Sequence, residues 1–167
     1  GMRTLIFAPS LDTRYGAGKV TSRIGLQAEA LIFRDTDDLF VTSRSEHRRE
    51  PVSCVLVDEA QFLSATQVLQ LTLVCDRLNI PVLCYGLRGD FMTRSFPGSQ
   101  RLLEIAHAIE ELKTICRCGS KAVFNGRRID GEFVSHGAQV AIDGQQAEYE
   151  SLCGRCYIEK VGPVRHG

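Results

Sequence analysis

Several features that mark specialised protein classes are missing from this 167-residue sequence. Trp is absent, and aromatic residues make up only 7% of the chain. Lys plus Arg and Asp plus Glu both number 20, so the net charge is zero and nothing attracts the chain as a whole to nucleic acid or an anionic membrane. No hydrophobic run approaches the length of a membrane span. Residues 1–4 lead directly into a hydrophobic segment, so we expect no signal peptide.

The composition is that of one folded domain with room for a small appendage. Hydrophobic residues make up 44% of the sequence and charged residues 24%, a balance that excludes a disordered tail or a collagen-like fibre. Cysteines number seven, and this odd count argues against a disulfide scaffold and for a reducing compartment. Three of them, Cys54, Cys75 and Cys84, lie in hydrophobic segments, where we expect small buried side chains.

Strand-like and helix-like segments alternate along the first part of the chain. Nearly continuous β-formers at 52–57 and 81–85 are typical of strands buried on both faces of a parallel sheet. Ser64 and Asn79 are the expected ends of an amphipathic helix between them. Further expected elements are a strand over 3–8, a helix over about 38–47 capped by Asp35, Thr36 or Asp37, a helix over 100–109 and a strand over 112–116. The alternation predicts an α/β fold with a mostly parallel sheet.

The composition changes at about residue 113. Beyond it come paired cysteines, several glycines and short alternating segments. We therefore predict two domains, an α/β core over residues 1–112 and a small, separately stabilised subdomain over residues 113–167.

Four cysteines in the second part have the spacing of a metal site. Cys116-x-Cys118 and Cys153-x-x-Cys156 are separated by 34 residues that are too polar and glycine-rich to build a core. Four thiolates on two short knuckles suit a tetrahedral structural zinc, whose binding stabilises the fold. Such a zinc has no open position, so it is not the catalyst. Two alternatives stay open: four unrelated thiols, and a redox Cys-x-x-Cys, which we do not expect here because this motif does not open a helix after a βαβ strand.

Two acidic residues follow the predicted strand over 52–57. Ligands of open α/β sheets bind outside the carboxyl ends of the strands, where Asp58 and Glu59 lie. An Asp after a hydrophobic strand is the Walker B arrangement that holds the Mg²⁺ of a nucleotide, and the neighbouring Glu59 is placed to act as a base toward a hydroxyl. The alternative is a solvated Asp-Glu pair in a turn.

A glycine-rich segment resembles a phosphate-binding loop but does not fit one. Walker A requires G-x-x-x-x-G-K-[ST], so the segment ending in Gly18-Lys19 would need Gly at position 13 and a hydroxyl at position 20. The chain has Thr13 and Val20 there. We therefore reject this segment as a Walker A loop.

Taken together, the motifs resemble the zinc-containing thymidine kinases, the cytosolic, tetrameric type, and most of all their bacterial branch. The resemblance runs from residue 1 to about 156. It is carried by LDTRY (11–15), GAGKVTSRIGL (16–26), VDEAQFL (57–63), CYGLRGDF (84–91) and the four paired cysteines. It implies a P-loop NTPase-like, mostly parallel sheet with helices on both faces and a small zinc-ribbon subdomain that carries a substrate-binding loop, the lasso.

The implied activity is the ATP-dependent phosphorylation of thymidine to thymidine monophosphate in the cytoplasm, by a homotetramer when full-length. Glu59 matches the general base of the family and Asp58 the Walker B carboxylate near Mg²⁺. The residues that match the ATP side are Asp12, Arg14, Asp58, Glu59, Ala60 and Gln61. Those that match the thymidine site are Phe62, Leu87, Phe91, Phe96 and Tyr149, with Val140, Ala141, Ile142, Asp143 and Gly144 in the lasso. Thymidine is thus expected between residues 86–96 and 138–149, where we expect exposed aromatic side chains to stack on the base. The alternative for Phe96 is that it only packs its loop against the sheet.

The chain departs from the family pattern at two places. The family begins with a strand and a Walker A loop, whereas the first strand expected here matches the second strand of the family. The resemblance therefore implies an N-terminally truncated fragment, which alone should lack kinase activity. The other departure is Asp143, where the family often has Gly, and this changes the backbone freedom of the lasso.

Two further hypotheses assign the chain to other functional classes. A non-catalytic zinc-ribbon module that binds nucleic acid or protein would explain the cysteines, but it needs no Asp58-Glu59 pair, and the neutral charge argues against nucleic acid. A thiol oxidoreductase would require free thiols, which a tightly bound zinc excludes.

Overall fold

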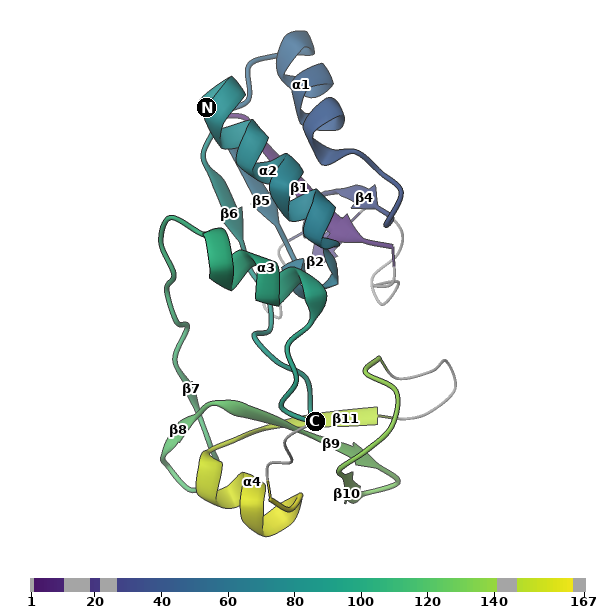
Figure 1. Ribbon diagram of the computed structural model, residues 1–167, viewed down its shortest axis with the longest axis vertical. Helices are drawn as coiled ribbons and strands as arrows, with labels where there is room; N and C mark the ends of the chain where they lie inside the picture. Colours follow the sequence, from purple (N-terminus) through teal and green to yellow (C-terminus); the bar gives the residue numbers. More distant parts are fainter. Residues whose placement is uncertain (1, 11–18, 22–26, 141–146, 164–167) are drawn as a thin grey trace. The chain divides into compact units, whose positions relative to one another are not determined.

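The computed structural model describes residues 2–10, 19–21, 27–140 and 147–163 (Figure 1). The chain forms two compact units, the first comprising Gly1–Leu87 and Pro97–Ile105 and the second Arg88–Phe96 and Ala106–Gly167. Residues 88–96, although they precede α3 in the sequence, thus belong to the second unit. The domain boundary at 112/113 stays a prediction.

The first unit is built on a four-stranded sheet in the order β4-β1-β5-β6. The strands are β1 (Thr4–Pro9), β4 (Leu31–Phe33), β5 (Cys54–Val57) and β6 (Val82–Cys84). All three strand pairs are parallel, as predicted, and Val57 lies opposite both Phe7 and Cys84. The carboxyl ends of β1, β5 and β6 therefore meet at one edge. A separate antiparallel pair joins β2 (Lys19–Thr21) to β3 (Gln27–Glu29).

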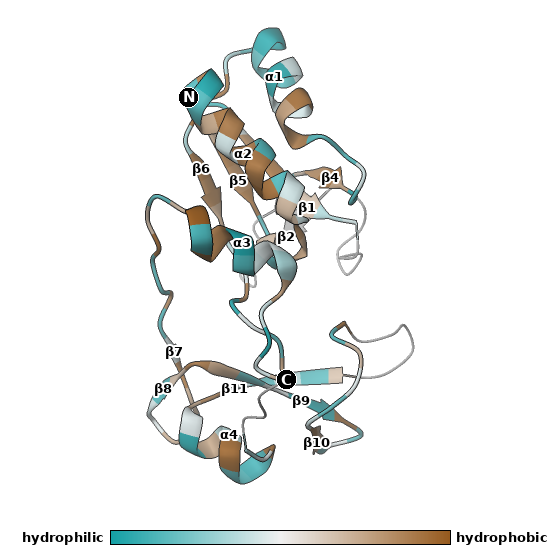
Figure 2. Cartoon of the chain, viewed as in Figure 1, coloured by the Kyte–Doolittle hydropathy of each residue, from teal (hydrophilic) through white to brown (hydrophobic). Residues whose placement is uncertain are grey.

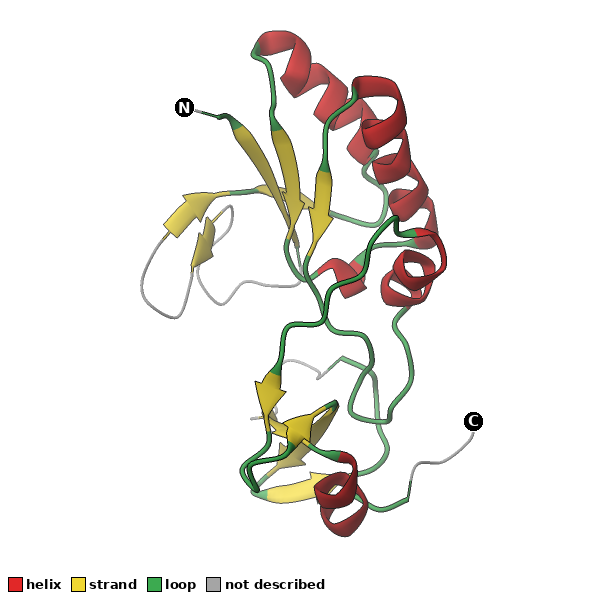
Figure 3. Ribbon diagram, turned by 90° about the vertical axis from the view of Figure 1, so that its left-hand side faces the viewer, coloured by secondary structure: helices red, strands yellow, loops and turns green. Residues whose placement is uncertain are grey.

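The helices of this unit cover one face of the sheet (Figure 3). They are α1 (Leu39–Arg49), α2 (Ala65–Leu78), α3 (Pro97–Ile105) and the short 3-10 helix η1 (Ala60–Phe62). Hydropathy agrees with this arrangement. Figure 2 shows that β5 and β6 are hydrophobic, whereas α1 is mostly hydrophilic. The main core contains Leu5, Phe7, Val55 and Val57 from the strands and Leu39, Val68, Leu71 and Val74 from the helices. The predicted α/β class with a parallel sheet flanked by helices is confirmed, but the described helices lie on one face of the sheet, whereas the resemblance implies helices on both faces.

The opposite face of the sheet is more open than expected. Side chains alternate along a strand, so Ile6, Leu56 and Leu83, which are paired in register, point away from the helices. Leu83 is 41% exposed, and Ile6 and Leu56 are half-buried. The expectation that residues 52–57 and 81–85 are buried on both faces is therefore wrong for the described chain, in which no helix covers this second face. Cys54, Cys75 and Cys84 are correspondingly half-buried, not fully buried.

Local sequence signals explain where the helices begin and end. Ser64 and Gln67 form a reciprocal capping box, and Asn79 ends α2 in the left-handed conformation, both at the predicted positions. The α1 helix is capped by Asp38 and not by residues 35–37, because the Asp38 carboxylate accepts the amide hydrogen of Val41 at 2.9 Å. The α3 helix begins at Pro97, a residue suited to the first helical position, and so lies earlier than the predicted 100–109.

The second unit is a small antiparallel sheet with a short helix. Its strand order is β10-β9-β11, formed by β9 (Phe124–Ile129), β10 (Glu132–Val134) and β11 (Ala147–Leu152). A hairpin of β7 (Thr114–Ile115) and β8 (Lys121–Ala122) and the helix α4 (Gly154–Lys160) complete it. A second, smaller core gathers Cys116, Ala122, Leu152, Cys153 and Tyr157. Among the described residues of both units, no helix has the length and hydrophobicity that a membrane span requires.

Candidate functional site

The acidic pair lies at the carboxyl edge of the first unit, directly after β5. The Asp58 amide donates to the carbonyl oxygen of Phe7 at 2.9 Å, and the Ala60 amide donates to that of Tyr85 at 2.8 Å. Backbone hydrogen bonds to both neighbouring strand ends therefore fix this turn. The half-buried Asp58 and Glu59 stand where a nucleotide and its metal bind in open α/β sheets.

Glu59 is held in an uncommon geometry by a buried glutamine. Its backbone is left-handed, with φ 48° and ψ 42°, a conformation that costs a non-glycine residue energy and often occurs at functional sites. The Gln61 side-chain amide donates to Glu59 Oε2 at 2.5 Å, and Gln61 Oε1 accepts the Leu87 amide hydrogen at 3.0 Å. Gln61 is only 2% exposed, so its amide has little freedom to release the carboxylate.

A glycine makes this arrangement possible. A Cβ atom on Gly86 would lie 2.6 Å from Gln61 Oε1, so any side chain at residue 86 would displace the amide that holds Glu59. The sequence shows a glycine directly after the strand predicted over 81–85. Only the structure shows that Gln61 lies beside this Gly86.

Of the other four residues assigned to the ATP side, the structure describes two. Ala60 and Gln61 are buried in η1 beside Glu59, whereas Asp12 and Arg14 lie outside the described residues. Lys19 and Val20 belong to the strand β2, while the lysine of a Walker A loop lies at the start of a helix. This agrees with the rejection of the segment as a phosphate-binding loop, although residues 13–18 lie outside the described part of the chain.

The residues assigned to the thymidine site occupy both units. Phe62, half-buried, and Leu87, 43% exposed, belong to the first. Phe91, Phe96, Val140 and Tyr149 belong to the second, and Ala141, Ile142, Asp143 and Gly144 lie outside the described residues.

The expected exposure of the aromatic residues is only partly correct. Phe91 is 1% exposed and Phe96 6%, so the expectation that both are exposed is wrong. Tyr149 is 55% exposed, as expected, but it lies on the strand β11 and not in a loop. Phe91 is buried because the guanidinium of Arg127 covers its ring, with Cζ 3.6 Å from the ring centroid.

Within the second unit, the two segments expected to enclose thymidine contact each other. The side-chain amide of Gln139 donates to Asp90 Oδ2 at 3.1 Å. Asp90 Oδ1 in turn accepts the amide hydrogens of Met92 and Arg94, each at 2.8 Å, which shapes the loop over residues 88–96. Asn125 of β9 donates to the carbonyl oxygen of Gly89 at 3.3 Å. The loop is therefore attached both to β9 and to the segment that leads toward Val140.

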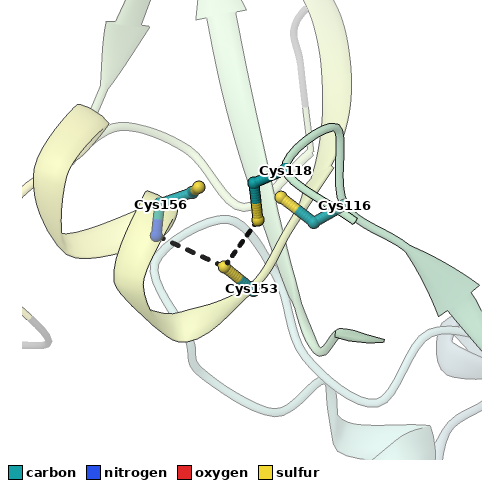
Figure 4. Close-up of side chains that lie close together, drawn as sticks. All are labelled: Cys116, Cys118, Cys153 and Cys156. Atoms are coloured by element: carbon teal, nitrogen blue, oxygen red, sulfur yellow. Dashed lines mark hydrogen bonds between the residues drawn. The ribbon is translucent and has the colours of Figure 1, made fainter. Parts of the chain in front are cut away.

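The four paired cysteines come together in the second unit (Figure 4). Their sulfur atoms all lie within 4.8 Å of one another, and those of Cys118 and Cys153 are 3.6 Å apart. Zinc–sulfur bonds of about 2.3 Å place the corners of a tetrahedron about 3.8 Å apart, so the cluster fits such an ion. The amide hydrogen of Cys156 also points to the Cys153 sulfur, at 3.5 Å between N and Sγ. The four cysteines could thus hold a metal ion such as zinc, and four unrelated thiols are excluded.

The cluster also changes the acidity of its thiols. The pKa of Cys118 is lowered to about 6, first by hydrogen bonds from Ser120 and then by those from neighbouring cysteines. Hydrogen bonds from the amides of Cys118 and Cys153 lower the pKa of Cys116. The pKa of Cys156 is raised to about 12 by contact with the other thiols, Cys118 first. Because metal ligands must be thiolates, binding of a cation to these cysteines releases protons.

The surroundings of Cys153-x-x-Cys156 bear out the expectation that it is not a redox motif of the βαβ type. Cys153 is the N-cap of α4, so the motif does open a helix. The strand before it, β11, is antiparallel to β9, so the motif does not follow a βαβ strand. The helix forms because the Cys153 sulfur accepts the Cys156 amide hydrogen, a contact that also orients the sulfur toward the cluster.

Sequence reasoning missed Gln61 as a holder of Glu59 and missed Arg127 entirely. Gln61 was assigned to ATP by resemblance alone. Arg127 and Arg128 are adjacent in a strand, and because side chains alternate, one of the two had to point inward. That alternation is a signal that could have identified a buried arginine.

Comparison with known proteins places the chain in a family. The family model described as thymidine kinase matches residues 1–157. A thymidine kinase of Pasteurella multocida is 52% identical over 161 residues, which cover 96% of this chain and 83% of the relative. Thymidine kinases of Haemophilus influenzae and Vibrio cholerae are each 51% identical, over 98% and 97% of this chain and 84% of each relative. With its Asp58-Glu59 pair at the end of a parallel strand and its cysteine cluster, the chain belongs to the thymidine kinase family.

Proposed function

We propose that this chain acts in the ATP-dependent phosphorylation of the 5′-hydroxyl of thymidine. The observation that carries the proposal is Glu59, a carboxylate held by the buried Gln61 at the carboxyl edge of a parallel sheet. A base must be oriented before it can take a proton from a substrate hydroxyl, and this geometry supplies the orientation. Family membership supplies the substrate class.

Glu59 and Asp58 have separate roles in the proposal. Glu59 takes the proton of the 5′-hydroxyl while the hydroxyl oxygen attacks the γ-phosphorus, and the bond between the γ-phosphorus and the bridging oxygen of ADP breaks. Mg²⁺-ATP, when bound, supplies the phosphoryl group, and carboxylates such as Asp58 suit Mg²⁺. Ala60 and Gln61, together with Asp12 and Arg14, belong to the same nucleotide side by family resemblance.

By family resemblance, the residues that recognise thymidine are Phe62 and Leu87 of the first unit and, in the second unit, the part that bears Tyr149. The segments 88–96 and 138–140 are linked by Gln139 and Asp90, which supports their joint role in binding the base. Because Phe91 and Phe96 are buried, they act as the fixed wall of the site and not as free stacking surfaces. The backbone of residues 140–144 reads the edge of the base, as the family resemblance implies.

The cysteine cluster is proposed to bind a structural zinc. Four protein sulfurs leave no open coordination position, so the ion takes no part in phosphoryl transfer. It holds the start of α4 and the turn after β7 together, and β11 with Tyr149 ends next to Cys153. The remaining family properties, a homotetramer located in the cytoplasm, are proposed on resemblance alone. A non-catalytic zinc-ribbon module is less well supported, because it gives no role to the strained Glu59.

Replacing Tyr149 with Ala is expected to weaken thymidine binding about tenfold. Stacking of one base on an aromatic ring contributes about 1–3 kcal/mol, and 1.4 kcal/mol corresponds to tenfold. Isothermal titration calorimetry of the zinc-loaded chain with thymidine measures the change. Ile158→Ala is a matched control, since Ile158 is also 55% exposed but lies on α4. Equal thymidine affinity in Tyr149→Ala and the unmodified chain would contradict the proposed site.

A further inference from the structure

Arg127 lies at the centre of the antiparallel sheet of the second unit. On β9 it is paired in register with Tyr149 of β11 and with Val134 of β10. Directly paired residues point to the same face of an antiparallel sheet, so Arg127 and the exposed Tyr149 share one face. The next residue, Arg128, points to the other face, where it contacts Glu150 and the ring of Phe133.

The guanidinium of Arg127 is buried without a carboxylate partner. The residue is 3% exposed, and no ion pair joins it to any residue that the structure describes. Its Nη1 donates to the carbonyl oxygen of Ala138 at 2.8 Å, and its Nε has no hydrogen-bond partner. Burying a cation in this way costs free energy, and a hydrophobic side chain of similar length often fills such a space with equal or greater stability.

Two side-chain contacts of Arg127, with Phe91 and with Ala138, reach segments assigned to thymidine. Its Cζ lies 3.6 Å from the ring centroid of Phe91, a distance suited to a strong cation–π contact. A Cβ atom on Gly137 would lie 2.6 Å from Nη2, and Gly137 has a φ of +135°, so the chain passes the guanidinium at a position that requires glycine. One side chain thus contacts the loop over residues 88–96 and the segment 137–138 that precedes Val140.

We propose that Arg127 is a positioning residue for the nucleoside, which holds Phe91 and the segment around Ala138 in the arrangement that thymidine binding requires. The inference rests on the proposed function. The planar guanidinium suits this task because one face covers an aromatic ring while its edge donates to a carbonyl oxygen, a combination that no hydrophobic side chain offers. On this proposal, the buried charge is present because it serves thymidine binding and not because it stabilises the fold.

The test compares Arg127→Met with Arg128→Met in the zinc-loaded chain. We expect Arg127→Met to leave the zinc content and the melting temperature unchanged or slightly raised. Amide hydrogen exchange over residues 88–96 and 137–139 should increase about tenfold or more, and thymidine should bind about tenfold more weakly. Arg128→Met should leave exchange in both segments and thymidine affinity unchanged. A purely structural role would instead lower the melting temperature and raise exchange across β9 and β11.

Arg127→Lys tests the contact itself and serves if Arg127→Met does not fold. Lysine keeps a cation near the ring of Phe91, so it should recover part of the thymidine affinity and of the exchange protection in residues 88–96. Unchanged exchange in both segments in Arg127→Met, or an Arg127→Lys variant as impaired as Arg127→Met, would overturn the proposal. If the unmodified chain binds no thymidine, the proposed function fails, whereas the exchange data still decide whether Arg127 connects the two segments.

Discussion

Replacing Glu59 with Gln is expected to lower the kcat of thymidine phosphorylation about 10²–10⁴-fold, the usual contribution of a general base. The amide has nearly the shape of the carboxylate and keeps an oxygen that can accept from the Gln61 side chain. It cannot accept the proton of the 5′-hydroxyl. The affinities for thymidine and ATP should therefore change little, because only a step of the reaction is lost.

Asp58→Asn is the matched comparison for this experiment. Asp58 follows the same strand but is proposed to act on the metal, so its loss should weaken Mg²⁺-ATP binding as well as turnover. Steady-state assays with radiolabelled ATP separate the two variants. For the assay, the N-terminal part of a bacterial thymidine kinase is joined ahead of this chain, and the same reaction without thymidine is the blank. Retained turnover in Glu59→Gln would remove Glu59 as the base.

Removing the metal is expected to unfold the second unit while leaving the first folded. Apparent binding free energies of structural zinc are about 10–16 kcal/mol in small domains, which is large compared with what a core as small as that around Leu152 and Tyr157 supplies. Elemental analysis should find about one zinc per chain. A strong chelator should then abolish hydrogen-exchange protection in β9 and β11 but not in β1 and β5.

Two cysteine variants make the zinc prediction specific. Cys153→Ser removes a ligand and the N-cap of α4 and should lose both the metal and the protection. Cys54→Ser changes a half-buried cysteine of the first unit and should keep the full zinc content. Because zinc binds thiolates, the metal should also be lost as the pH falls. Full zinc content in Cys153→Ser would contradict the assignment of the ligands.

The elements that could be predicted from the sequence are those with strong local signals. The run of β-formers before Asp58 and the reciprocal cap between Ser64 and Gln67 specify β5 and the start of α2 without help from distant residues. The cysteine cluster was predictable for a similar reason, because only ligand spacing and a glycine-rich interval are needed to recognise it. Where the local signals are weaker, the predicted boundaries are off by a few residues. The cap of α1, for example, is Asp38 and not one of residues 35–37.

What could not be predicted depends on contacts between distant segments. Phe91 lies in a polar loop, and it is covered in part by the guanidinium of Arg127, which is remote in sequence. In the same way, the Gln61 amide is identified as the holder of Glu59 only when Leu87 and Gly86 are seen beside it. Hydrophobic periodicity reports which face of an element is buried but not what it is buried against. The acidic pair after β5 and the cysteine cluster could be located from the sequence, whereas the contacts that support them could not.

The most direct measurement is a calorimetric titration of the zinc-loaded chain with thymidine and, separately, with 2′-deoxycytidine and 2′-deoxyadenosine. The account predicts saturable binding of one thymidine per chain and at least tenfold weaker binding of the other two nucleosides, because residues 88–96 and 138–140 are proposed to recognise the thymine base. No heat with thymidine, or equal affinities for all three nucleosides, would contradict it.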